Sequence, residues 1–167
     1  IWFARNSLTQ RTVGPNFTSE TCVLTENMKP GDYAGLAAIS AHYGMVGVKC
    51  DENGNRYVFQ GCNSDTNSGA KAKKEDKIKE NAVSEEKIEG NAPVYLKIEY
   101  AFNTGKTRAD KANFFYSLDG ENWKSIGETF SLGFDTATTF MGTRSWLVNY
   151  ATKEADGYVD FDYYKVK

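Results

Sequence analysis

The sequence predicts an antiparallel β-sandwich of jelly-roll character, folded as one domain over residues 1–167. Apolar and polar residues alternate with a period of two in segment after segment, and turn residues separate these segments. In the stretch Lys111–Gly127, an aromatic run, an Asp-Gly turn and Trp123 describe a β-hairpin. The aromatic faces of this hairpin are too large for an isolated ribbon. A second sheet must therefore cover them.

The first half of the chain consists of short segments that end at glycine, proline or asparagine. Gly14-Pro15-Asn16 and Lys29-Pro30-Gly31-Asp32 are breaks, and Asn53-Gly54 is the tip of a turn. The segment Ala34–Ala41 is small and apolar on both faces, which indicates a strand buried on both sides. The predicted strands of this half are Trp2–Val13, Glu20–Glu26, Ala34–Ala41, Tyr43–Cys50 and Arg56–Gly61.

The segment Asn63–Asn91 differs from the rest because it is rich in lysine, glutamate, aspartate, asparagine and serine. Such a composition cannot bury a core of its own. It predicts a charged, solvated insertion, part helical around Lys71–Glu86 or part irregular. A partner-binding helix is the alternative.

The second half resumes the strand pattern. In Val94–Phe102 the even-numbered residues are apolar, and Tyr95, Lys97 and Glu99 on the opposite face indicate contact with water. After the hairpin, Phe140–Tyr150 is another long strand, and Tyr158–Val166 closes the chain. Alternation in this last strand places two groups on opposite sides: Val159, Phe161 and Tyr163 on one, and Asp160, Asp162 and Tyr164 on the other.

Charge and composition exclude several classes of partner. The formal net charge of −2 gives no positive field for nucleic acid or an anionic membrane. No apolar run approaches the roughly 20 residues of a membrane span, and the first residues do not resemble a signal peptide. Ile1 begins inside a predicted strand, which indicates a piece cut from a longer polypeptide.

The three cysteines, Cys22, Cys50 and Cys62, lack the spacing of metal ligands, and His42 is the single histidine. The sequence therefore does not predict a zinc site. We interpret the cysteines as small core or strand residues. The sequence does not decide whether two of them form a disulfide. Because their number is odd, at least one thiol is unpaired within this chain.

Four blocks in order carry a resemblance to a known family: Ala4–Gly14, Gly31–Val48, the hairpin FFYSLDGENW and the ending GYVDFDYY. Together they resemble the β-sandwich that follows the catalytic propeller in glycoside hydrolase family 43, which contains β-xylosidases and α-L-arabinofuranosidases. The resemblance covers nearly the whole chain except the charged insertion.

The resemblance implies a concanavalin-like sandwich attached to a catalytic propeller of the same polypeptide, in a bacterial protein that is secreted or held at the cell surface. The partner it implies is plant cell-wall xylan or arabinoxylan, or an oligosaccharide of either. In relatives a loop of the sandwich can approach the mouth of the catalytic pocket. The family's catalytic aspartates and glutamate lie in the propeller, so the resemblance implies that this chain alone is not an enzyme.

An independent glycosidase is the alternative that the carboxylates leave open. Asp160 and Asp162 on one strand face would lie roughly 6.5 to 7 Å apart, which fits a carboxylate pair. However, the E-x-D-x-x-E run of laminarinase-type sandwiches is not matched, because Val159 follows Glu154-Ala155-Asp156 where the second glutamate would stand.

A carbohydrate site needs an aromatic platform beside side chains that hydrogen-bond to sugar hydroxyls. The strand Phe140–Tyr150 offers both kinds of residue. The alternative interpretation is that Trp146 and Tyr150 belong to the core and that Arg144 makes a structural hydrogen bond. The candidate sugar-binding residues are Arg144, Trp146, Asn149 and Tyr150, with Gln10, Arg5, Asn6 and Tyr43 from the earlier blocks.

A structural calcium ion is a second possibility, with Asp156, Asp160 and Asp162 as its ligands. Alternating aspartates on a terminal strand can equally be solvated, and no cofactor is required. The sequence thus predicts a non-catalytic accessory sandwich of a xylan-degrading glycosidase that binds carbohydrate or shapes the substrate pocket. A purely structural interdomain module without sugar affinity is the alternative.

Overall fold

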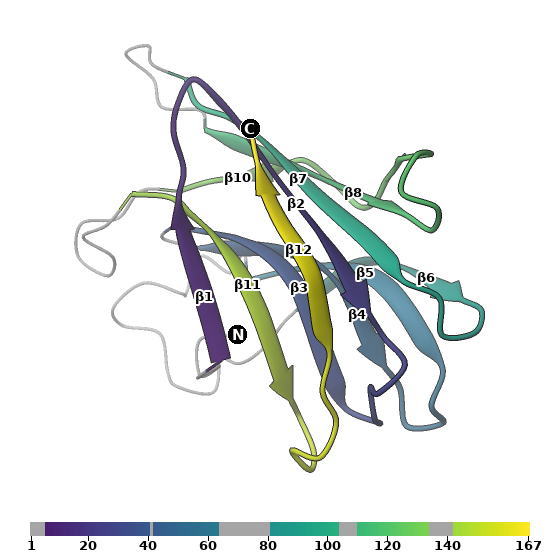
Figure 1. Cartoon of the computed structure of the whole chain (residues 1–167). Helices are drawn as coiled ribbons and strands as arrows, with labels where there is room; N and C mark the ends of the chain where they lie inside the picture. Colours follow the sequence, from purple (N-terminus) through teal and green to yellow (C-terminus); the bar gives the residue numbers. More distant parts are fainter. Residues whose placement is uncertain (1–5, 41, 64–80, 104–109, 134–141) are drawn as a thin grey trace.

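A computed structural model describes residues 6–40, 42–63, 81–103, 110–133 and 142–167 of the chain. They form two antiparallel sheets packed face to face, which confirms the predicted sandwich (Figure 1). Sheet A contains, in spatial order, β1 (Asn6–Arg11), β11 (Arg144–Ala151), β3 (Asp32–Ile39), β4 (Tyr43–Cys50), β5 (Arg56–Cys62) and β6 (Asn81–Ile88). Sheet B contains β10 (Phe130–Ser131), β8 (Lys111–Ser117), β7 (Val94–Ala101), β2 (Asn16–Leu24) and β12 (Asp160–Val166), with β9 (Lys124–Ser125) paired to β8. No helix able to span a membrane occurs among the described residues.

The main core lies between the two sheets. On β7 the side chains of Val94, Leu96, Ile98 and Tyr100 are buried, while the residues between them are only partly buried. This confirms the predicted alternation, because a strand with one wet face turns every second side chain inward. The hairpin of β8 and β9 is also present, with Phe114 and Tyr116 among the core residues.

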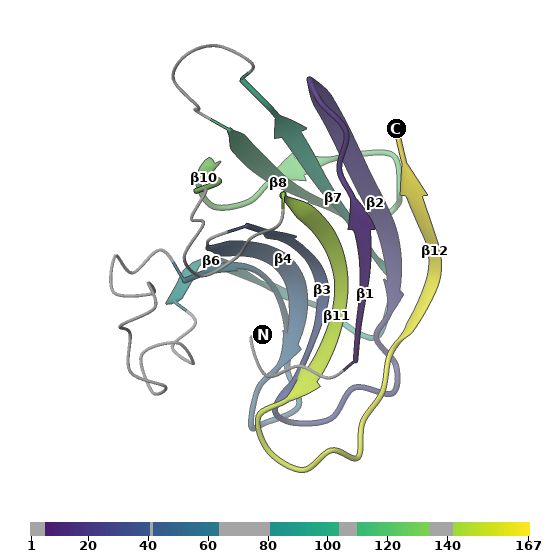
Figure 2. The same cartoon turned by 90° about the vertical axis from the view of Figure 1, so that its left-hand side faces the viewer.

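Strands β3 and β4 are buried on both faces, as the run of small residues predicted. Their strong curvature is visible in Figure 2. The two strands approach so closely that a Cβ atom on Gly35 would lie 2.3 Å from the carbonyl oxygen of Val46. Glycine at this position is therefore a packing requirement.

A second apolar cluster lies on the face of sheet A that points away from sheet B, here called the outer face. Its buried members alternate along their strands with residues of the main core. Tyr43 and Met45 are fully buried there, although sheet B lies on the other side. The buried members of this cluster are Ala37, Ile39, Tyr43, Met45, Phe59 and Val148.

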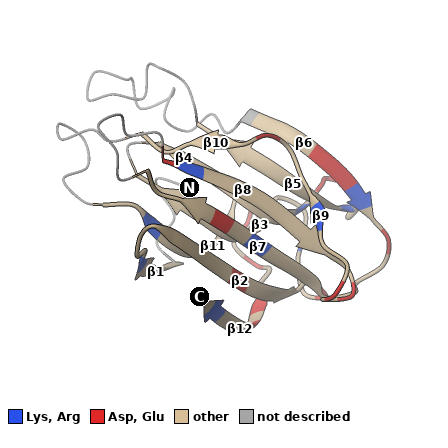
Figure 3. Ribbon diagram, turned by 90° about the horizontal axis from the view of Figure 1, so that it is seen from above, with Lys and Arg blue, Asp and Glu red and all other residues tan. Residues whose placement is uncertain are grey.

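The charged insertion contains a strand where part of a helix was expected. Residues 81–88 form β6, which pairs with β5 at the edge of sheet A and carries Glu85, Glu86 and Lys87 (Figure 3). The helical interpretation of Lys71–Glu86 is thus wrong for residues 81–86, and residues 64–80 lie outside the described part. An edge position explains the composition, because only one side of an edge strand hydrogen-bonds to the sheet and charged residues prevent further pairing.

A β-bulge changes the predicted faces of the last strand. Phe161 pairs with Val23 and Tyr163 with Cys22, so Asp162 is the extra residue. The inward side therefore carries Phe161 and Tyr164, which pack against the core, whereas the Tyr163 hydroxyl donates to Glu20 at 2.6 Å. Alternation alone had assigned Tyr163 to the wrong side, because a bulge shifts all later residues by one.

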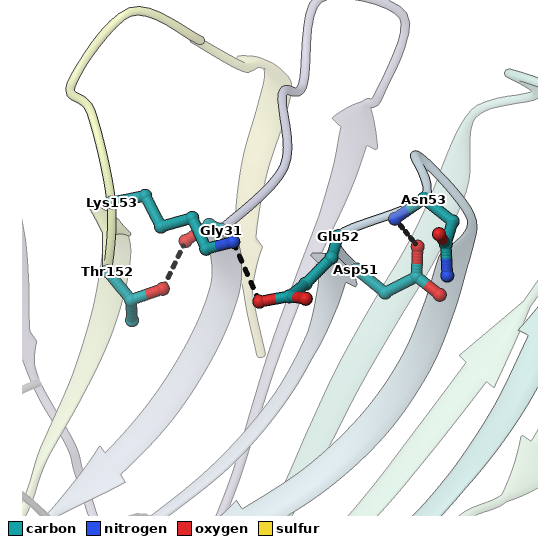
Figure 4. A network of polar contacts seen from close by, with 6 residues as sticks. All are labelled: Gly31, Asp51, Glu52, Asn53, Thr152 and Lys153. Atoms are coloured by element: carbon teal, nitrogen blue, oxygen red, sulfur yellow. Dashed lines mark hydrogen bonds and ion pairs between the residues drawn. The ribbon is translucent and has the colours of Figure 1, made fainter.

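Polar contacts join three loops at one end of the sandwich (Figure 4). The carbonyl oxygen of Gly31, before β3, accepts bonds from the N–H and the hydroxyl of Thr152 at 2.9 and 3.0 Å. Lys153 forms an ion pair with Glu52 in the β4–β5 turn at 2.7 Å. These contacts tie together the loops that follow β2, β4 and β11. The three cysteines are buried, and none of them forms a disulfide bond.

Candidate functional site

The outer face of sheet A carries the aromatic residues that the sequence singled out. Strand β11 pairs with β3, and its residues Arg144, Trp146 and Tyr150 lie opposite residues of the outer face. All three side chains therefore lie on this face. Their partners on β3 are Ile39, Ala37 and Tyr33, in that order. Each of the three β11 side chains is partly buried. Period-two spacing on a single strand is what brings them to one side.

Of the other predicted sugar-binding residues, three are described with their side chains: Asn149, Gln10 and Tyr43. Asn149 and Gln10 have the opposite strand parity, since Gln10 pairs with Ser145, a residue fully buried between the sheets. Tyr43 lies on the outer face but is fully buried, so its ring has no surface to offer a ligand. Arg5, and the side chain of Asn6, lie outside the described residues.

A line of side chains that sequence reasoning missed crosses the outer face at right angles to the strands. The register places Tyr150 on β11 beside Tyr33 on β3, then Lys49 on β4, then Tyr57 on β5. We call these four residues the tyrosine row. All of them are partly buried, and each lies at the end of its strand that faces the loop network of Figure 4.

Ring contacts hold the tyrosine row in place. The rings of Tyr33 and Tyr150 are stacked, with centroids 5.1 Å apart and planes inclined by 7°. The edge contact between Tyr33 and Phe59 spans 5.6 Å at 86°. These contacts limit the rotation of the rings, which reduces the entropy lost when a ligand binds.

Lys49 places a positive charge between the rings. Its ammonium nitrogen lies 5.7 Å from the ring centroid of Tyr57 and 6.0 Å from that of Phe59. It also forms an ion pair with Glu85 on β6. The row therefore combines flat apolar rings with a paired acid and base, both able to hydrogen-bond to hydroxyl groups.

A sequence signal for the row exists, but it is spread over four strands. Tyr33 and Tyr57 are each close to a predicted turn, at Lys29–Asp32 and at Asn53-Gly54. Lys49 precedes the second of these turns, and Tyr150 is the last residue of a predicted strand. Outward aromatic residues at strand ends can be found by pattern. Their alignment into one row follows from register, which a single sequence does not reveal.

Trp146 also lies on the outer face, four residues before Tyr150 on β11. Its indole Nε1 is buried and has no hydrogen-bond partner among the described residues. The indole N–H is therefore closed to a sugar hydroxyl in this conformation, and only the part of the ring that remains exposed can contact a ligand. Trp146 also packs against the apolar cluster of the outer face, so it has in part the core role that the alternative interpretation of Trp146 predicted.

The candidate calcium ligands are dispersed. Asp156 is exposed and forms an ion pair with Lys29, Asp160 pairs with Leu24 on β2, and Asp162 is the bulged residue. Within the described ranges, no group of three or more histidine, cysteine, aspartate or glutamate residues could hold a metal ion. The bulge also separates Asp160 and Asp162 from the regular spacing assumed for a carboxylate pair.

The whole chain, residues 1–167, matches the model of the β-xylosidase C-terminal concanavalin A-like domain, GH43_C2. A β-xylosidase of Formosa agariphila is 28% identical over 167 residues, which are 98% of this chain and 24% of that protein. A bifunctional GH43-CE protein of Bacteroides eggerthii is 38% identical with a TM-score of 0.81, over 98% of this chain and 19% of that one. A xylan β-1,4-xylosidase of Bacillus halodurans, 16% identical, shares the fold with a TM-score of 0.71, over 95% of this chain and 29% of its own.

Proposed function

This chain belongs to the family of β-xylosidase C-terminal concanavalin A-like domains, and from this premise we propose that it is a non-catalytic accessory domain of a xylan-degrading glycosidase of family 43. The chain spans about a quarter or less of the length of the first two relatives it matches. The activity of the complete enzyme, its polysaccharide substrate and its catalytic propeller are parts of this proposal.

We further propose that the outer face of sheet A contacts a xylan or arabinoxylan chain. The observation that carries this proposal is the stacked pair of Tyr33 and Tyr150, which continues through Lys49 to Tyr57 in one row across four strands. Sugar rings present apolar C–H faces that pack against aromatic rings. A row that crosses the strands suits an extended chain better than a single sugar.

Calorimetric titration of the chain with xylo-oligosaccharides and arabinoxylo-oligosaccharides tests this binding. We expect Tyr33→Ala to weaken binding about tenfold, which corresponds to about 1.4 kcal/mol. Trp123→Ala is the matched control, because Trp123 contacts Lys97, a residue of sheet B. Equal heats for the Tyr33 variant and the unaltered chain would remove the outer face as the binding surface.

The non-catalytic role has its own test. We expect the purified chain to release no chromophore from aryl xylosides or aryl arabinofuranosides, because Asp160 and Asp162 are exposed, separated by the bulge, and not held in a common site. Release that disappears in Asp160→Asn would instead identify the chain as an independent glycosidase.

A structural module without sugar affinity is the second candidate, and exposed apolar residues favour it. Leu8 on β1 is 74% exposed and Val13, just after that strand, is 65% exposed. A neighbouring domain that covers them would remove apolar surface from water. If so, Leu8→Asp should weaken association of the chain with its catalytic domain in calorimetry, while Lys111→Asp on sheet B should not.

A further inference from the structure

Strand β1 is an open edge of sheet A. Among the described strands it pairs with β11 alone, and it lies at the outer margin of the sheet (Figures 1 and 2). Its residues from Leu8 to Arg11 are all exposed. An open edge strand presents unpaired N–H and C=O groups, which can form hydrogen bonds with a strand of another chain.

The other three edges of the described sheets carry features that block such pairing. Strand β6 contains the charged run Glu85–Lys87. Strand β12 has a bulge at Asp162, and β10 is only two residues long. Charges, bulges and short length are the means by which proteins protect sheet edges from other strands. The segment Asn6–Gln10 of β1 has none of them, because it is uncharged and pairs with β11 in an unbroken register.

Leu8 is the apolar residue of this edge. It pairs with Leu147, a residue of the main core, so its side chain is on the side of sheet A that faces sheet B. It is nevertheless 74% exposed, the largest value among the exposed large hydrophobic residues of the described chain. A partner strand on β1 would place a side chain directly beside Leu8 and would remove apolar surface from water.

We propose that β1 pairs in antiparallel orientation with β1 of a second copy of this chain, around a two-fold axis at Leu8. In this register Leu8 lies opposite Leu8 of the copy. Ser7 lies opposite Thr9 of the copy, and these two residues are on the other face of the strand. The two copies of sheet A then form one continuous sheet. This proposal does not depend on whether the domain binds sugar.

Symmetry restricts the register of such a pair. The main-chain groups of successive residues point to opposite edges of a strand, and opposed residues of an antiparallel pair point the same way. A two-fold axis must therefore lie between two copies of the same residue. An axis at Thr9 would leave Leu8 opposite Gln10 and would bring the charged Arg11 into the pair. An axis at Leu8 places leucine against leucine and pairs only the uncharged segment Asn6–Gln10.

Sedimentation velocity of the chain over a range of concentrations tests the pairing. So short a strand buries far less surface than the roughly 1,200 to 2,000 Å² of a standard stable interface, so we expect a weak dimer that dissociates on dilution. Leu8→Lys should raise its dissociation constant at least about tenfold, because it places two ammonium groups opposite each other. Leu118→Lys is the matched control, since Leu118 is 49% exposed in the turn after β8, and it should leave the constant unchanged.

Two outcomes of this measurement would overturn the proposal. A chain that stays monomeric up to about 1 mM would leave β1 without a second copy and available to a neighbouring domain. A dimer that Leu8→Lys leaves intact would place the contact on another surface.

Cysteine cross-linking tests the register. Opposed residues of an antiparallel pair have Cα atoms about 4.5 to 5.5 Å apart, which fits a disulfide. We therefore expect Leu8→Cys to form a covalent dimer in oxidised glutathione. Thr9→Cys should not, because diagonal neighbours are about 7 to 8 Å apart. The native cysteines are buried, so the unaltered chain is the blank. Equal cross-linking at the two positions would contradict the axis at Leu8.

Discussion

The side chain of Gln60 forms two hydrogen bonds with the main chain of Glu128, which lies 68 positions later in the sequence. Its Nε2 donates to the Glu128 carbonyl at 2.8 Å, and the Glu128 N–H donates to its Oε1 at 2.6 Å. Gln60 is 1% exposed and belongs to sheet A, whereas Glu128 lies between β9 and β10 of sheet B. The amide therefore pairs with the loop in the way a neighbouring strand would, and it joins the two sheets at one edge.

Gln60→Ala should destabilise the fold. The change leaves a donor and an acceptor of Glu128 without partners in a partly buried position, which costs about 1 to 3 kcal/mol. The free energy of unfolding from urea titration measures this loss. Gln10→Ala, at an exposed glutamine on β1, is the matched control and should change stability little. Equal values for the two variants would show that the pair contributes nothing.

Gly127→Ala should cost more than Gly54→Ala. Both glycines have positive φ, +68° and +80°, so alanine at either position introduces backbone strain of about 1 to 2 kcal/mol. A Cβ atom at Gly127 would also lie 1.6 Å from Oε1 of Gln60, while a Cβ atom at Gly54 would meet no heavy atom within 4 Å apart from its chain neighbours. A comparison of the two variants by thermal unfolding separates the steric effect from the backbone effect. Similar melting temperatures would contradict the role of Gln60 at this loop.

The turn after β8 should make the free energy of unfolding depend on pH in the acid range. The Asp119 carboxylate accepts hydrogen bonds from the side chain and N–H of Asn122, at 2.7 Å each, and from Ser117 and Glu121, and together these lower its pKa. Because the folded pKa is depressed, this stabilisation is complete above the unfolded value near pH 4 and is lost as the pH falls below it.

Asp119→Asn tests this dependence. We expect the variant to be less stable than the unaltered chain at pH 7 and the difference to shrink as the pH falls below about 4. Urea unfolding across pH 2.5 to 7 measures the change. Asp160→Asn, which leaves this turn unaltered, is the control. A difference that stayed constant over the whole range would exclude the carboxylate charge as its cause.

On the face of sheet B that points away from sheet A, the ammonium group of Lys97 lies close to two aromatic rings. Its ammonium nitrogen is 4.7 Å from the Phe115 centroid and 4.6 Å from that of Trp123, and it pairs with Glu99 at 3.0 Å. Lys97→Met keeps most of the apolar stem and removes the charge, so we expect a loss of about 1 kcal/mol in chemical denaturation. Lys111→Met at an exposed position is the control. No loss in Lys97→Met relative to this control would indicate that only the stem of Lys97 matters.

The sequence by itself determined the sandwich, because alternation along strands such as Val94–Ala101 and the Asp-Gly turn are local properties. It also placed Arg144, Trp146 and Tyr150 on one side, since their spacing lies within one strand. It did not find β6, because the charged composition that keeps an edge strand soluble also describes a solvated helix. The bulge at Asp162 was equally hidden, and it reversed the face of Tyr163.

Only the tertiary structure decided which residues meet across strands. Tyr33, Lys49, Tyr57 and Tyr150 form a row because of pairing register, and the side chain of Gln60 meets the main chain of Glu128 because two sheets pack face to face. These contacts join residues far apart in the chain. Their geometry depends on how the sheets twist and align, whereas a period of two specifies only the side of the strand on which each residue lies.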